Sequence, residues 1–220
     1  MSFIVPFPPS GGKVTHSFLS IATSGFSTAT TYTFAGMNFG TAFATRYIVA
    51  CVMWSGGGGL SSCTIGGVSA SIIANALNST SCGMGVAAVP SGTSGTVVAN
   101  ITGGGNANGC VIGLYALNGI NSPAASQIMQ STANPPAASL NPQPGSVVIA
   151  CATGGHVGGC TPSWSGLTGD SQAAFGFSGN GEGGVASAEF VNAPGTFTAT
   201  CNWLPGTALS AGCFAIFNPP

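Results

Sequence analysis

Short apolar runs recur along the whole chain, and Gly, Asn, Ser and Pro clusters separate them. The runs are rich in Val, Ile, Thr and aromatic residues, and no stretch combines the apolar period of an amphipathic helix with capping residues. This pattern predicts an all-β protein. The glycine runs Gly56–Gly59 and Gly103–Gly105 are expected to form loops. The expected strands are Thr15–Ile21, Thr31–Phe34, Arg46–Trp54, Ser69–Ala76, Gly83–Val89, Gly95–Ile101, Cys110–Leu117, Ser126–Ser131, Ser146–Ala152, Gln172–Phe177, Gly184–Val191, Gly195–Trp203 and Ala211–Phe217.

The second half of the chain echoes the first at an offset close to 100 residues. In each half an Ala-Cys pair lies in a Val- and Ile-rich run, and a Cys-Thr pair follows a glycine-rich loop. A near-constant shift over several landmarks indicates two related halves. The matched landmarks are Cys51 with Cys151, Cys63 with Cys160, Thr96 with Thr196 and Cys110 with Cys213, at offsets of 100, 97, 100 and 103 residues.

The Pro-rich segment Asn134–Gly145 lies between the two halves, and two arrangements are open. Each half can form a small sandwich, or the halves can be the two Greek keys of one jelly roll. We expect the second, a single jelly-roll-like β-sandwich over residues 14–220, because a shared core buries more of these short strands. Its pseudo-repeated halves are about 30–122 and 123–220, and the prolines of residues 1–13 predict an extended arm.

Charge is almost absent from the chain. Charged residues make up 2% of the sequence, whereas an ordinary globular protein has about 25%. Two cations cannot displace the counterions of a nucleic acid or bind an anionic membrane surface, so we exclude both partners. Surface polarity must come from Ser, Thr, Asn and Gly, and this favours a protein held in a fixed assembly. The charged residues are Lys13, Arg46, Asp170, Glu182 and Glu189.

The mean hydropathy of +0.47 is high, but the apolar runs are short. The longest, Tyr47–Trp54, has eight residues, whereas a spanning helix needs about 20. Residues 1–13 have neither the basic region nor the sustained apolar region of a secretory signal. We therefore expect synthesis in a cytoplasm, without an export signal and without membrane insertion.

The even number of cysteines favours disulfides, which would then form after release from a reducing cytoplasm. Matching glycine-rich loops suggest the pairs Cys51–Cys63 and Cys151–Cys160, and a hairpin suggests Cys201–Cys213, leaving Cys82 and Cys110. Intermolecular bridges would change this set, and buried thiols that act as small apolar side chains are the alternative. The eight residues are Cys51, Cys63, Cys82, Cys110, Cys151, Cys160, Cys201 and Cys213.

Residues that carry chemistry are few. The spacing Cys151-x4-His156-x3-Cys160 is the best metal candidate, but it lacks a fourth ligand, and a disulfide-closed hairpin is the preferred interpretation. The residues that could serve in acid–base catalysis are Asp170, Glu182, Glu189, His16 and His156. We expect the three carboxylates to be solvated on the surface. We therefore predict no catalytic residue, no metal, no cofactor and no enzymatic activity.

Most of the aromatic residues are expected to pack in the core. Trp164 lies in Pro162–Gly166, a turn-like stretch, and is the best candidate for exposure. Tryptophan stacks on sugar rings, and neutral Asn, Ser and Thr around it suit sugar hydroxyls. Trp164 is therefore a candidate carbohydrate contact.

Three segments together resemble a known group of proteins: Phe34–Gly40 followed by Arg46–Ala50, then Thr64–Ala70, then Ala87–Val98. Their order is similar to virion-associated structural proteins of tailed bacteriophages, over about Thr31–Phe217. The resemblance implies a jelly-roll or sandwich module of a capsid decoration, collar or tail protein. The eight cysteines and the low charge depart from that pattern.

Together, these features predict a structural virion protein that decorates or cements the particle through neutral interfaces and disulfides. Its expected partners are other virion proteins and further copies of itself, with a trimer favoured, and its expected location is the virion. The alternative is a carbohydrate- or receptor-binding module of a phage tail or collar appendage.

Overall fold

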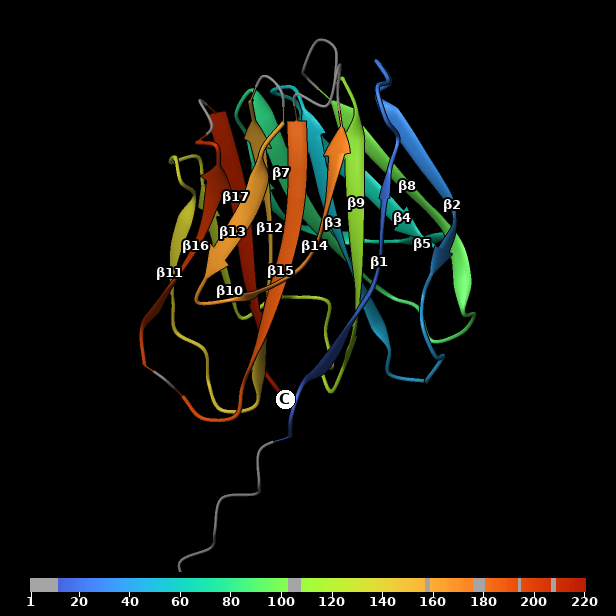
Figure 1. Ribbon diagram of the computed structural model, residues 1–220. Coiled ribbons are helices and arrows are strands. Elements are labelled where there is room, and N and C mark those ends of the chain that lie inside the picture. The colour runs from blue at the N-terminus through green and yellow to red at the C-terminus, as the bar shows by residue number, and fades with distance from the viewer. Residues whose placement is uncertain (1–11, 103–107, 157–158, 176–180, 194, 207–208) are drawn as a thin grey trace, which may run out of the picture.

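The computed structural model describes residues 12–102, 108–156, 159–175, 181–193, 195–206 and 209–220. The described chain is all-β (Figure 1). Its strands are β1 (Thr15–Thr23), β2 (Thr31–Asn38), β3 (Tyr47–Ser55), β4 (Gly59–Ile65), β5 (Val68–Ser69), β6 (Ser71–Ala76), β7 (Thr80–Ala88), β8 (Ser94–Thr102), β9 (Cys110–Asn118), β10 (Gln127–Ser131), β11 (Ala137–Leu140), β12 (Ser146–Gly155), β13 (Thr161–Ser165), β14 (Thr168–Phe175), β15 (Gly181–Phe190), β16 (Phe197–Leu204) and β17 (Leu209–Phe217).

The strands form four antiparallel sheets, and each sheet takes its strands from one half of the chain. The first half forms a five-stranded sheet of order β1-β9-β3-β7-β6 and a four-stranded sheet of order β2-β8-β4-β5. The second half forms a five-stranded sheet of order β10-β17-β12-β15-β14 and a three-stranded sheet of order β11-β16-β13. Figure 1 shows the second half on the left and the first half on the right.

The central strands of each five-stranded sheet are buried on both faces, because their side chains alternate between two cores. On β3, Val49, Cys51 and Met53 enter a central core between the two five-stranded sheets. The intervening residues of β3, such as Val52 and Trp54, enter a first-half core against the four-stranded sheet. Strand β12 divides in the same way: its odd-numbered residues from 147 to 151 join the central core, and its even-numbered ones from 148 to 152 face a second-half core.

The all-β sandwich predicted from the sequence is confirmed, whereas a single jelly roll is not. Each half has its own pair of sheets, as in the alternative arrangement, and the central core joins the two pairs. The strand orders of the two five-stranded sheets correspond position by position. β1 belongs to the first-half sheet although it precedes residue 30, and residues 1–11 of the expected arm lie outside the described part of the chain.

The register corrects one landmark of the sequence echo. Cys51 lies opposite Gly113, and Cys151 lies opposite Cys213. Cys213 therefore corresponds to Gly113, at the same offset as the Cys51–Cys151 match, and not to Cys110, which lies opposite Trp54.

Each expected strand overlaps an observed one, but three further strands, β4, β11 and β13, are not predicted. β4 begins at Gly59, the end of an expected loop, and β11 lies inside the Pro-rich segment Asn134–Gly145. Small residues and proline make up most of β11 and β13 and the start of β4, so the local strand signal is weak although their partners hold these segments extended. The expected Gly103–Gly105 loop and residues 176–177 of one expected strand lie outside the described residues.

Glycine lets the two five-stranded sheets approach closely. A Cβ atom added at Gly113 on β9 would lie 2.8 Å from Cγ1 of Val185 on β15. Because Val185 is β-branched and fully buried, its side chain cannot rotate away freely.

We expect Gly113→Ala to destabilise the protein by about 1–3 kcal/mol through overpacking of the central core. The measurement is the urea midpoint of unfolding. Gly59→Ala is the matched control, because nothing lies within 4 Å of an added Cβ and its φ is not positive. Equal midpoints for the two variants would contradict the tight packing of the sheets.

Candidate functional site

The buried charge of Arg46 is held entirely by backbone carbonyls. Its side chain is fully buried, and burial lowers its pKa. All six of its described hydrogen bonds end on carbonyl oxygens, including Nε to Val89 at 2.7 Å, Nη1 to Phe39 at 2.9 Å, and Nη2 to Ser91 and Gly92 at 2.8 and 2.7 Å. Arg46 therefore ties two turns at one end of the first half, and its charge is not presented to solvent.

A polar network contains three of the four other charged side chains of the sequence, together with His16. Nζ of Lys13 lies 2.6 Å from Oε2 of Glu189 on β15. The His16 ring, on β1, lies between Glu189 and Ser187, with Nδ1 3.1 Å from Oε1 of Glu189 and Nε2 2.8 Å from Oγ of Ser187. These contacts connect the edge strand of the first-half sheet to the second half.

From Ser187 the network extends to Asp170 and to the buried side chain of Tyr115 on β9. Oδ2 of Asp170, on β14, accepts hydrogen bonds from the Ser187 hydroxyl and from the Tyr115 hydroxyl, both at 2.7 Å. The Tyr115 ring is fully buried, and its edge-to-face contact with Phe18 has a centroid distance of 5.5 Å. Lys13, His16, Asp170 and Glu189 thus lie in one chain of contacts at the border of the two halves.

The Ser187 and Tyr115 hydroxyls both donate to Asp170, so the Ser187 oxygen remains able to accept a hydrogen bond from Nε2 of His16. The Lys13 hydrogen bond, helped by His16, lowers the pKa of Glu189.

Ser187, His16 and Glu189 contact one another in the same succession as the serine, histidine and carboxylate of a catalytic triad. However, Ser187 is only 3% exposed, and its hydroxyl proton is directed at Asp170. A nucleophile must reach its substrate and give its proton to the histidine. We therefore interpret the network as a polar joint between the halves. The expectation of solvated carboxylates holds for Glu189, which is exposed, but is wrong for Glu182, which is buried, whereas Asp170 is half-buried.

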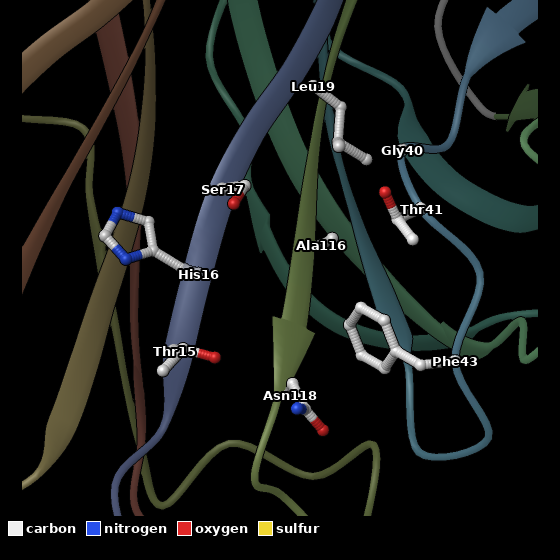
Figure 2. Close-up of a pocket in the computed structure, with 9 residues that line it drawn as sticks. All are labelled: Thr15, His16, Ser17, Leu19, Gly40, Thr41, Phe43, Ala116 and Asn118. Carbon is white, nitrogen blue, oxygen red and sulfur yellow. The ribbon is translucent and has the colours of Figure 1, made fainter.

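A cavity of about 360 Å³ lies on the other side of β1 (Figure 2). Leu19, Thr41 and Phe43 point toward one another around it, whereas the His16 ring points away to the opposite side of the strand. The groups that face this cavity are therefore uncharged.

A smaller depression, of about 170 Å³, contains the predicted sugar contact. It is lined by Trp164 and Pro162 of β13 together with Asp170 and Gln172 of β14, and by two small residues, Gly169 and Ser171. The turn-like context expected for Trp164 is wrong, because the residue lies within β13 and is half-buried. Its indole packs edge-on against Phe214, with ring centroids 6.3 Å apart.

The eight cysteines are buried thiols, and no disulfide joins them. The expected pairs fail because their members face different cores. The central core contains Cys51, Cys82, Cys151 and Cys213, the first-half core contains Cys63 and Cys110, and the second-half core contains Cys160 and Cys201.

This division separates every pair expected from the sequence. Cys51 and Cys63 lie on opposite sides of the first five-stranded sheet, and Cys151 and Cys160 on opposite sides of the second. The same separation prevents Cys151, His156 and Cys160 from forming one metal site. Burial raises the pKa of Cys63 to about 12, so this thiol is protonated at neutral pH.

Glu182 on β15 is a carboxyl group that the network does not include. It lies opposite Gly154 and Ala174 and is 6% exposed. Burial raises its pKa to about 7, because the charged form loses its hydration.

Comparison with models of protein families, with curated proteins and with solved structures finds no match to this chain. Within the residues described, no helix has the length and apolar character needed to cross a membrane.

We expect wild-type stability to fall as pH rises from about 4.5 to about 7, because the fold favours the protonated form of Glu182 and the unfolded chain ionises first. Glu182→Gln should remove this decline. The measurement is the urea midpoint at several pH values.

Glu189→Gln is the matched control for the pH series. Its pKa is lowered in the fold, so Glu189 contributes stability above its unfolded pKa that is lost as pH falls through the folded pKa. Its replacement should leave the loss between about pH 4.5 and 7 in place. If Glu182→Gln kept the wild-type slope in that range, the burial of Glu182 would not be its cause.

Proposed function

We propose that this chain is a structural virion protein of a tailed bacteriophage, which decorates or cements the particle through neutral interfaces. One structural observation supports this most strongly: every charged side chain is buried or engaged within the chain. Arg46 and Glu182 are buried, and Lys13, Asp170 and Glu189 belong to the network. The resemblance of the sequence to virion-associated proteins is the reason for proposing a phage particle as the assembly.

A surface of this kind binds partners by shape, apolar contact and hydrogen bonds from Ser, Thr and Asn. Long-range attraction between charges, which salt screens, contributes little. Such a surface gives little electrostatic guidance to a freely diffusing complex, but it suits subunits held permanently side by side. The expected neighbours are further copies of the chain, with a trimer favoured, and other virion proteins.

A second candidate function is carbohydrate recognition at the Trp164 depression. An aromatic side chain and a proline there adjoin the hydrogen-bonding groups of Asp170, Ser171 and Gln172. Apolar stacking beside a few polar groups is the usual composition of a small-ligand site. This site would serve a tail or collar appendage that contacts a receptor.

We expect the protein to be found in purified phage particles and to stay attached when the salt is raised from about 0.05 M to about 1 M, because neutral contacts are insensitive to screening. Quantitative mass spectrometry of washed particles measures this, and analytical ultracentrifugation of the isolated chain tests for the trimer. Absence from the particles, or release at high salt, would contradict the proposal.

For the second candidate, Trp164→Ala should abolish binding on a glycan array on which the wild type binds. Thr161→Ala is the control, because Thr161 is an exposed residue of the same strand and does not line the depression. Binding that is absent in the wild type, or unchanged in Trp164→Ala, would argue against carbohydrate recognition.

A further inference from the structure

Three thiols meet in the central core, where the halves face each other. Cys82 comes from β7 of the first half, whereas Cys151 and Cys213 are register partners on β12 and β17 of the second. Their Sγ atoms all lie within 4.8 Å of one another, and those of Cys82 and Cys213 are 3.5 Å apart. Among the described residues, no other group of three His, Cys, Asp or Glu side chains converges in this way.

The surroundings of this thiol cluster favour uncharged sulfur over metal-bound thiolate. Backbone carbonyl oxygens face the sulfur atoms: that of Cys82 lies 3.4 Å from Sγ of Cys213, that of Cys151 lies 3.8 Å from Sγ of Cys82, and that of Gly83 lies 3.9 Å from Sγ of Cys151. These oxygens accept S–H hydrogen bonds but would repel thiolates. Burial also raises the pKa of Cys82 well above its ordinary value.

A divalent metal held by three thiolates would place a net negative charge in this core. The neighbours of the cluster are apolar side chains such as Ala76, Met84 and Ala211, which cannot compensate a charge. A disulfide is neutral and buries no charge. Of the two reactions open to neighbouring cysteines, the core therefore suits oxidation.

We propose that Cys82 and Cys213 form an internal disulfide once the protein leaves a reducing compartment. Rotation of the two side chains brings their sulfur atoms from 3.5 Å to about 2.05 Å. The two thiols give up two protons and two electrons, and one S–S bond forms. A low-molecular-weight disulfide such as oxidised glutathione accepts the two protons and two electrons, and its own S–S bond breaks to give two thiols.

The bond would connect the halves covalently across 131 residues of sequence, whereas the pairs expected from the sequence alone would each have closed a loop within one half. Because it closes so long a loop, it should stabilise the protein by restricting the unfolded chain. This inference is independent of the proposed virion function, since it rests on the packing of one chain.

The test uses the full-length protein, folded with oxidised glutathione and then unfolded with an alkylating reagent. We expect a mass about 2 Da below that of the reduced chain before alkylation, six alkylated cysteines of the eight, and a Cys82–Cys213 linked peptide after proteolysis. The oxidised protein should also have a higher urea midpoint than the reduced one.

Cys82→Ala should show no loss of mass and seven alkylated cysteines. Cys110→Ala is the matched control, because Cys110 is equally buried but lies in the first-half core, and it should retain the linked peptide. Eight alkylated cysteines in the wild type, a different linked pair, or a metal ion retained by the native protein and lost in Cys82→Ala would each overturn the proposal. The wild-type peptide map decides the question even if a variant fails to fold.

Discussion

The two five-stranded sheets must lie face to face, because each has apolar side chains on both of its faces. Val49 and Met53 on one sheet, and Val147 and Ile149 on the other, meet only in the central core. A single half would leave that surface in water, and each fully buried aliphatic side chain contributes about 1.5–3 kcal/mol through its burial. The outer sheets are therefore positioned by the inner pair, and the two halves depend on each other.

Because the inner sheets are apolar on both faces, they also restrict where charged side chains can lie. The central strands of the inner sheets are buried, so Lys13, His16, Asp170 and Glu189 gather at the border of the two halves, where Lys13 and Glu189 remain partly exposed. Arg46 is accommodated at the end of the first half by carbonyl oxygens. The remaining surface has very little charge, mainly the Lys13–Glu189 ion pair, and the proposed packing against neighbouring virion proteins relies on this scarcity of charge.

Alternation and turn composition predict the strands well, because those signals are local. They miss β13, whose hydrogen bonds to β16 keep Pro162 and Ser163 extended. The cysteine pairs are wrong because nearness in sequence ignores the face on which each residue lies, as with Cys51 and Cys63. The His16–Glu189 contact spans 173 residues, and no sequence signal connects two such isolated side chains. It follows only from how the halves face each other.

Calorimetric unfolding of the intact chain tests this mutual dependence most directly. If the central core joins the halves into one cooperative unit, the heat-capacity trace should show a single transition whose calorimetric and van't Hoff enthalpies agree. Two separate transitions, one for each half, would show that the sandwiches are stable independently and would contradict the account.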